Sequence, residues 1–244
     1  MDDNLDQLLD NLKLRKIREI LDREIEHAEN KQLSYSALLA RLLRPEWEFR
    51  QERSIEHRIR KASLPERWSL DSFPFDKQPG IKAAAIRELA SLDFLRRGAN
   101  LVFVGDTGVG KTGLATGIVL EALKNGHRAR FIKAQDLFDE MYASLADRST
   151  RQLVDRLARV DVLLVDEMGY LNLKPEQSNI FFKLMEERYQ ACGGRSTIIT
   201  TNLQYDDWYE FLGKKEMVKA LLDRLRHRCH TIHIDGPSLR DPEG

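Results

Sequence analysis

The stretch Gly105-Asp-Thr-Gly-Val-Gly-Lys-Thr112 decides the fold of this 244-residue chain, because it matches the phosphate-binding pattern G-x-x-x-x-G-K-[ST] at every fixed position. An apolar strand, Asn100–Val104, precedes it, and residues 113–125 have the apolar spacing of a helix. The glycines let backbone N–H groups and the helix N-terminus point at phosphates. The pattern therefore predicts a P-loop, with Lys111 on the β- and γ-phosphates and the Thr112 hydroxyl on Mg²⁺.

A second nucleotide motif follows in Val160-Asp-Val-Leu-Leu-Val-Asp-Glu167, an apolar strand that ends in two carboxylates. A strand buried on both faces gains nothing from charge at its tip, so the two acids indicate a site. We expect Asp166 to hold Mg²⁺ and Glu167 to orient or deprotonate the attacking water. The alternative is that both are ordinary polar residues of a turn.

A third strand, Ser196-Thr-Ile-Ile-Thr-Thr-Asn202, ends on a polar amide. Ligands of open α/β sheets lie outside the carboxyl ends of the strands, so Asn202 is expected to fix the water beside the γ-phosphate. Alone, Asn202 could equally form a turn. The order of strand, P-loop, helix, acidic strand, helix and polar-tipped strand favours the catalytic interpretation and predicts a parallel sheet flanked by helices.

The first part of the chain has no strand pattern. Apolar spacing predicts a helix over residues 5–28 that could break near Leu14, a second helical stretch around residues 38–43 that Pro45 interrupts, and a third over 46–61. We therefore expect three parts. They are an all-helical domain over residues 1–63 that binds DNA or a partner, a linker beside the nucleotide over 64–80, and an ATPase domain over 81–244. Within the linker, residues 68–80 are typical of an ordered loop, and a helix is expected over 81–95.

Charge is balanced overall, with 39 Lys plus Arg and 39 Asp plus Glu, so only its distribution is informative. Basic residues gather in two segments, residues 41–67 and 213–230. The functional interpretation is a nucleic-acid surface, and the alternative is a solvated helix with Glu–Arg pairs four residues apart. The candidate DNA contacts are Arg50, Arg53, Arg58, Arg60, Lys61, Lys214 and Lys215.

Several classes of protein and site are disfavoured by composition. Cys192 and Cys229 have neither disulfide-framework nor zinc spacing, and the six histidines form no metal motif, so no metal beyond Mg²⁺ is expected. No apolar run approaches a membrane span, and the chain begins without a leader pattern. We expect a soluble, cytoplasmic protein with no membrane partner. The three tryptophans, Trp47, Trp68 and Trp208, are expected to be packing residues.

The P-loop, the strand Leu163-Leu-Val-Asp-Glu-Met-Gly-Tyr170, Ile198–Asn202 and Leu222-Asp-Arg-Leu-Arg-His-Arg-Cys-His230 together resemble the IstB family, as does the entry segment Leu89–Asn100. These are ATP-binding helper proteins of insertion sequence 21 transposons, related to DnaC-type helicase loaders. The resemblance covers roughly residues 5–240. It implies an AAA+ P-loop NTPase core, α/β in class, preceded by a small all-α domain. Because only four residues follow Arg240, we expect no C-terminal helical lid.

The resemblance also implies function. The family couples ATP to assembly on duplex DNA, bends that DNA and regulates the transposase of the same element in target selection. In this sequence Arg224 matches an arginine finger that acts across a subunit interface, so the ATP sites would lie between protomers of a homo-oligomer. Arg240 resembles a second sensor arginine. The implied nucleotide-contacting residues are Gly105, Asp106, Thr107, Gly108, Val109, Gly110, Lys111, Thr112, Gly113 and Arg240.

Three rival functions stay open from the sequence. A replicative helicase loader would share the fold but prefer single-stranded DNA. A P-loop kinase of a small molecule would act as a monomer and have little need of Glu167 or Arg224. A non-catalytic scaffold would use ATP only to gate binding, although intact Lys111, Asp166 and Glu167 argue against a dead site.

Overall fold

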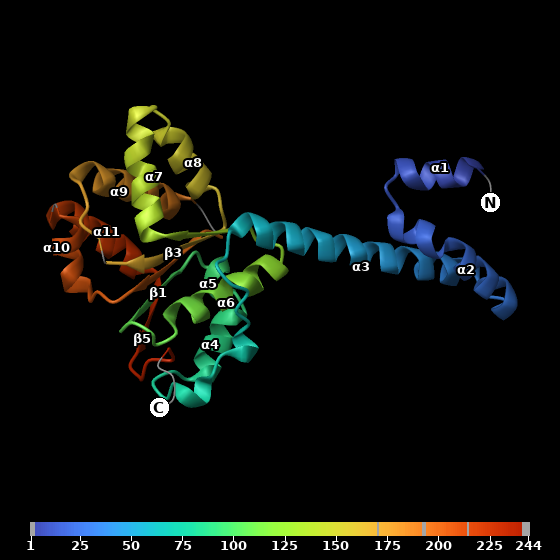
Figure 1. Cartoon of the computed structure of the whole chain (residues 1–244), viewed down its shortest axis with the longest axis horizontal. Coiled ribbons are helices and arrows are strands. Elements are labelled where there is room, and N and C mark those ends of the chain that lie inside the picture. Colours follow the sequence, from blue (N-terminus) through green and yellow to red (C-terminus); the bar gives the residue numbers. More distant parts are fainter. Residues whose placement is uncertain (1–2, 170, 192–193, 214, 241–244) are drawn as a thin grey trace. The chain divides into compact units, whose positions relative to one another are not determined.

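The computed structural model describes residues 3–240 except 170, 192–193 and 214. The chain divides into two compact units, Met1–His57 and Arg58–Gly244. Figure 1 shows the elements of both units, coloured along the sequence. Among the described residues, no helix is both long enough and apolar enough to cross a bilayer.

The first unit is helical. It contains α1 (Asp3–Asn11), α2 (Arg15–Lys31) and most of α3 (Tyr35–Ala62). The break expected near Leu14 is present, since Lys13 adopts a left-handed conformation with φ 55° between α1 and α2. Apolar side chains spaced three and four residues apart form the small core of this unit: Leu9, Ile17, Ile20, Leu21 and Leu42.

The expectation that Pro45 separates two helices was wrong, because α3 continues through it. A proline inside a helix loses one backbone hydrogen bond and crowds the preceding turn. Tertiary contacts of the next residue hold the helix here. Glu46 is 4% exposed, and its Oε2 accepts from the backbone N–H of Lys16 at 2.7 Å and of Ile17 at 3.3 Å, at the N-terminus of α2. Its Oε1 accepts from Arg50 at 2.8 Å. This carboxylate serves as the N-terminal cap that the sequence of α2 lacks.

The second unit is built on a parallel sheet with the strand order β2-β3-β4-β1-β5 in the described part of the chain. The P-loop strand β1 lies between β4 and β5, and β5 is at the edge. The strands are β1 (Asn100–Gly105), β2 (Ala129–Lys133), β3 (Val162–Met168), β4 (Ser196–Thr201) and β5 (Cys229–Ile234).

Helices cover both faces of this sheet (Figure 1). Val102 and Val104 of β1 belong to the core shared with α7 to α11, whereas the alternate residues Leu101 and Phe103, also buried, point to the opposite face, where α6 packs on β1 to β4. The helices are α4 (Ala83–Ala90), α5 (Asp93–Arg96), α6 (Lys111–Lys124), α7 (Ala134–Ala146), α8 (Thr150–Ala158), α9 (Pro175–Gln190), α10 (Trp208–Leu212) and α11 (Lys215–His227), with 3₁₀ turns η1 (Leu70–Ser72), η2 (Phe75–Lys77) and η3 (Tyr205–Asp207).

The single helix expected over residues 81–95 was wrong. The structure has α4 and α5, separated where Leu92 adopts φ 65°. Leu92 is 6% exposed, so its side chain is held in the core despite the left-handed backbone. After β5, the described chain to Arg240 contains no further helix.

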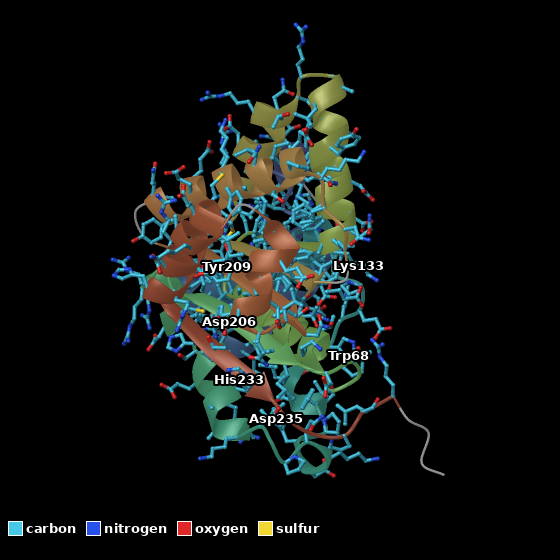
Figure 2. The ribbon with its side chains drawn as sticks, turned by 90° about the vertical axis from the view of Figure 1, so that its left-hand side faces the viewer. Trp68, Lys133, Asp206, Tyr209, His233 and Asp235 are labelled. Carbon is cyan, nitrogen blue, oxygen red and sulfur yellow. The ribbon has the colours of Figure 1, made fainter. Side chains whose placement is uncertain are left out.

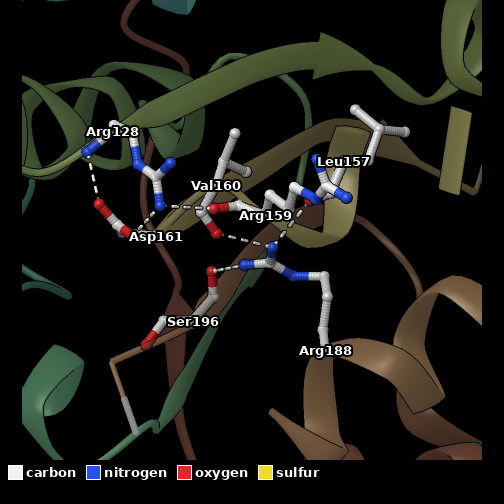
Figure 3. Close-up of polar contacts among 7 residues, drawn as sticks. All are labelled: Arg128, Leu157, Arg159, Val160, Asp161, Arg188 and Ser196. Carbon is white, nitrogen blue, oxygen red and sulfur yellow. Dashed lines mark hydrogen bonds and ion pairs between the residues drawn. The ribbon is translucent and has the colours of Figure 1, made fainter. Parts of the chain in front are cut away.

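A buried arginine, Arg188, joins α9 to the chain just before β3 and to the start of β4 (Figure 3). It therefore lies at the amino ends of these strands, whereas the P-loop follows the carboxyl end of β1. Arg188 donates to the carbonyl oxygens of Leu157 (2.9 Å), Val160 (3.0 Å) and Ser196 (2.6 Å), and its Nε donates to Thr197 Oγ1 (2.9 Å). Burial lowers the pKa of Arg188 to about 9, which leaves the guanidinium charged at neutral pH. Four oxygen acceptors therefore compensate a cation that is removed from water.

Candidate nucleotide-binding site

A cavity of about 750 Å³ lies at the carboxyl edge of the sheet in the second unit. Its walls come from the loop between α3 and α4, the P-loop, the ends of β2, β3 and β4, the start of α7 and the end of the described chain. Lining residues include Trp68, Phe73, Thr107, Gly108, Gly110, Lys111, Thr112, Gly113, Lys133, Asp166, Glu167, Thr200, Asn202, Leu239 and Arg240. The structure thus brings most of the predicted nucleotide residues to one cavity of a size suited to a small-molecule ligand.

The P-loop joins β1 to α6, as the motif predicts. Gly110 is the residue before α6 and has φ 95°, and a Cβ there would lie 2.7 Å from the ring of Phe73. The loop therefore needs glycine at this position both for its backbone conformation and for its packing. Lys111 Nζ donates to the carbonyl oxygens of Gly105 (2.8 Å) and Asp106 (2.7 Å). Burial lowers the pKa of Lys111, while the nearby carboxylate of Asp166 acts in the opposite direction.

Asp166 and Thr112 meet although 54 residues separate them. Thr112 Oγ1 donates to Asp166 Oδ1 at 2.8 Å, and Thr200 Oγ1 donates to the same oxygen at 2.5 Å. Asp166 is only 2% exposed, and burial raises the pKa of its carboxyl group, against the two hydroxyl hydrogen bonds, which lower it. A hydroxyl and a carboxylate held this closely are oxygen ligands of the kind that Mg²⁺ prefers.

Glu167 is more open to solvent than Asp166. It has φ 60°, at an irregularity in the register of β3 with β4, and its backbone N–H donates to Thr200 Oγ1 at 2.9 Å. Its side chain pairs with Lys133, at the end of β2, with Nζ and Oε2 3.3 Å apart and both side chains about half exposed. Such a pair is weak. The carboxylate is therefore held at the cavity but not locked there.

Asn202, directly after β4, has a buried Oδ1 with no hydrogen-bond partner among the described residues. A buried amide oxygen without a partner is costly, so it indicates an acceptor that a ligand or water would satisfy. Together with the Thr112–Asp166 pair and the P-loop lysine, this unsatisfied oxygen fits a nucleoside triphosphate with Mg²⁺. Among the described residues, no group of three or more His, Cys, Asp or Glu side chains forms another metal site.

The loop between α3 and α4 supplies cavity residues that the motifs did not identify. Trp68 is 41% exposed and lines the cavity, and Trp47 is 61% exposed, whereas Trp208 is fully buried, as expected of a packing residue. Figure 2 labels Trp68 and Lys133, which both line the cavity. Phe73 lies against Gly110 of the P-loop. The aromatic, proline-rich composition of residues 68–80 was the only signal for this wall in the sequence.

Arg224 lies elsewhere. It lines a separate cavity of about 330 Å³ between α9 and α11, which shares no lining residue with the nucleotide cavity. Its Nη2 is 3.4 Å from Glu186 Oε1, and its guanidinium lies 6.0 Å from the ring centroid of Tyr189. Its side chain is 41% exposed. Within one chain, therefore, Arg224 does not contact the nucleotide cavity.

The candidate DNA contacts differ in their surroundings. Arg50 donates to Glu46 and to the carbonyl oxygens of Leu12 and Lys13, and Arg58 Nε donates to Leu123 O at 2.8 Å. The other three candidates on α3 are exposed: Arg53, Arg60 and Lys61. The guanidinium of Arg53 lies over the ring of Phe49. Lys214 lies outside the described residues, and Lys215 is the first residue of α11.

Similarity to known proteins covers nearly the whole chain. Residues 7–243 match the family model described as IstB-like ATP binding protein. The insertion sequence IS21 putative ATP-binding protein of Pseudomonas aeruginosa is 35% identical over 97% of this chain and 88% of its own length. The insertion sequence IS232 putative ATP-binding protein of Bacillus thuringiensis subsp. berliner is 33% identical over 95% of this chain and 92% of its own length.

Solved structures share the fold of about 70% of this chain. A structure of DnaI superposes with a TM-score of 0.60 at 22% identity, over 69% of this chain and 92% of that one. A structure of the replication initiator DnaA, bound to AMPPCP and single-stranded DNA, superposes with a TM-score of 0.59 at 19% identity, over 72% of this chain and 52% of that one. A structure of the DnaC helicase loader superposes with a TM-score of 0.56 at 23% identity, over 69% of this chain and 97% of that one. The fold is that of AAA+ P-loop proteins, as predicted. With its P-loop, its acidic strand and this similarity, the chain belongs to the IstB-like ATP-binding protein family.

Proposed function

We propose that this ATP-binding protein hydrolyses ATP with the help of Mg²⁺ in the 750 Å³ cavity. The observation that carries the proposal is the 2.8 Å contact of Thr112 with Asp166, with Glu167 next in the chain and at the same cavity. Thr112 and Asp166 would hold the ion, which neutralises phosphate charge when bound. Lys111 would leave its two carbonyl acceptors for the phosphates. Glu167 accepts the proton of the attacking water, and Asn202 orients that water through its unsatisfied amide oxygen.

Assembly is the second part of the proposal. Arg224 is half exposed and remote from the cavity of its own chain, as expected of a side chain that acts on the nucleotide of a neighbouring copy. A nucleotide bound between two copies stabilises their contact by mass action, and its hydrolysis weakens that contact. The protein would therefore form homo-oligomers with ATP and release them on turnover.

The third part concerns DNA and a transposase. The relatives named above are ATP-binding proteins of insertion sequences, which supports a role in transposition. We propose that the oligomer binds and bends duplex DNA and regulates the transposase of the same element in target selection. Residues 1–63 would bind DNA or a partner, 64–80 would link them to the nucleotide site, and 81–244 would form the ATPase. No motif for base readout is present, so contacts would be to phosphates and DNA shape.

Sedimentation of the purified protein tests assembly. Large species are expected with ATP and duplex DNA, and not with ADP or without nucleotide. Lys111→Ala should abolish them, whereas Glu167→Gln should bind ATP and trap them, because only turnover is lost. Lys124→Ala, an exposed lysine at the other end of α6, is the matched control and should behave as wild type. A monomer under every condition would instead favour a small-molecule kinase, and assembly on single strands alone would favour a helicase loader.

DNA contacts are tested by salt dependence. Each lost phosphate contact should lower the slope of log affinity against log salt by about 1. Charge reversal of Arg60 and Lys61 should weaken binding to all duplex sequences alike and flatten that slope. Arg151→Glu, at an exposed arginine of α8 outside both basic segments, is the control. An unchanged slope in the double variant would contradict a role for these two residues.

A further inference from the structure

A completely buried glutamine lies beside the P-loop. Gln78, directly after η2, is 0% exposed, although glutamine is rarely so. Its Nε2 donates to Val109 O in the P-loop at 3.0 Å and to Pro237 O, after β5, at 2.8 Å. Both partners are carbonyl oxygens, so only the N–H₂ end of the amide can face them. One side chain therefore ties together three segments that are far apart in the sequence.

The segment after β5 packs tightly on the same loop. It begins at Asp235, labelled in Figure 2, and we refer to residues 235–240 as the C-terminal segment. The backbone N–H of Leu239 donates to Gly108 O at 2.9 Å, and a Cβ on Gly108 would lie 2.2 Å from Ser238 Oγ. Two successive P-loop carbonyls, of residues 108 and 109, are thus bonded by the C-terminal segment and by Gln78.

These contacts determine where the segment ends. Leu239 and Arg240, its last two residues, line the nucleotide cavity together with Lys111. The described part of the segment is neither helix nor strand, so no regular backbone ladder holds it in place. Its position depends on a few hydrogen bonds. The backbone N–H of Leu239 donates directly to Gly108 O in the P-loop, whereas Pro237 O is joined to the loop through Gln78, which also donates to Val109 O.

We propose that Gln78 is a positioning residue, which fastens the C-terminal segment to the P-loop and thereby holds Arg240 at the bound ATP. The inference rests on the proposed use of this cavity for ATP. Without the Gln78 amide, the carbonyls of Val109 and Pro237 lose their buried donor, and the segment can leave the loop. Arg240 then acts on the nucleotide only for part of the time. The effect of Gln78 on ATP affinity passes through Arg240.

The experiment is a double-mutant cycle on ATP affinity, measured by displacement of a fluorescent ATP analogue. Gln78→Met keeps the length of the side chain and removes the amide. It should weaken ATP binding about tenfold, which corresponds to the loss of one to two buried hydrogen bonds. Arg240→Ala should weaken it similarly. The double variant should be no weaker than the weaker single variant, because both substitutions interrupt the same contact.

A control is available in Gln177, which is 7% exposed and lies away from the nucleotide cavity. Its Nε2 donates to Phe138 O at 2.8 Å, and its Oε1 accepts from the backbone N–H of Lys174 at 2.8 Å. Gln177→Met should lower the unfolding temperature as Gln78→Met does but leave ATP affinity at the wild-type value. A merely structural role for Gln78 would make the two variants alike in both measurements.

Two results would overturn the inference about Gln78 but not the proposed ATP site. One is a double variant in which the losses of ATP affinity from the two single variants multiply, and the other is a Gln78→Met variant that binds ATP as wild type does. Absence of ATP binding by the wild type would overturn the proposed site as well. Hydrogen exchange of the wild-type protein covers the case in which Gln78→Met does not fold. ATP should slow exchange in residues 235–240, and unchanged exchange there would also overturn the coupling.

Discussion

Replacing Asp166 by asparagine separates the effect of its buried charge on folding stability from the proposed role of that charge in binding Mg²⁺. The carboxylate is 2% exposed and its Oδ1 accepts from two threonine hydroxyls. An asparagine Oδ1 can accept the same two hydrogen bonds without the charge. Burial raises the pKa of Asp166 in the folded protein, so the ionised group opposes folding, and stability is lost as the pH rises through that folded pKa. We therefore expect Asp166→Asn to stabilise the protein at neutral pH when no metal is present.

The size of the effect follows from the surroundings of the carboxylate. Two neutral donors and the half-exposed Lys133 offset only part of the desolvation cost of a buried charge. Removing such a charge while keeping its hydrogen bonds should stabilise the protein by about 1–2 kcal/mol. For a domain of this size, the unfolding temperature would rise by roughly 2–8 °C.

Thermal unfolding in the presence of a chelator measures this difference. The advantage of Asp166→Asn over wild type should shrink as the pH is lowered toward the raised pKa, because the wild-type carboxyl then takes up a proton. Addition of Mg²⁺ with ATP should stabilise the wild type and much less the variant. Asp155→Asn, with the same change in net charge at a partly exposed site on α8, is the control. A variant less stable than wild type without metal, or a difference independent of pH, would refute the reasoning.

Three further substitutions test other parts of the structure. Arg188→Met should lower the free energy of unfolding by about 3–5 kcal/mol, because four oxygens lose a charged donor, and a urea titration that shows under 1 kcal/mol would contradict this. Lys133→Met should release Glu167 and raise the ATP hydrolysis rate up to about fivefold with unchanged ATP affinity, as a half-exposed pair is worth at most about 1 kcal/mol; an unchanged rate would show that the pair does not restrain the glutamate. Gly110→Ala should weaken ATP binding at least tenfold, since strain of about 1–3 kcal/mol adds to a clash, whereas Gly126→Ala, with a similar φ but open space, should leave binding unchanged; equal binding by the two variants would oppose this.

Local pattern accounts for the parts of the fold that were predicted correctly. The apolar runs before Gly105 and Asp166 are long enough for central strands and are punctuated by turn residues, so their type and order could be inferred without tertiary information. The glycines of the P-loop motif allow the positive φ angles that the loop adopts at Gly108 and Gly110, so the loop could be predicted from the motif alone. Asp166 became a candidate for the site because a carboxylate at the end of a buried strand is costly unless it binds a partner.

Local pattern failed where distant contacts decide the backbone. Pro45 lies inside α3, because Glu46 is held by the amides at the start of α2, some 30 residues earlier. Leu92 interrupts a sequence with good helical spacing, because the core holds its side chain in a left-handed backbone. Neither partner is visible within a window of the sequence, so propensity alone gave the wrong boundaries.

By itself, the sequence determined the fold class, a parallel P-loop fold, and it identified Lys111, Thr112, Asp166 and Glu167 as candidate site residues. Only the tertiary structure decided what surrounds these residues. It brought Trp68 and Arg240 to the cavity, paired Lys133 with Glu167 and kept Arg224 away. The physical reason is that motif residues act through backbone geometry that is encoded locally. The positions of Trp68 and Arg240 depend on how the loop between α3 and α4 and the segment after β5 pack on the sheet. The pairing of Lys133 with Glu167 depends on β2 lying beside β3 in a sheet whose strand order differs from the order of the chain.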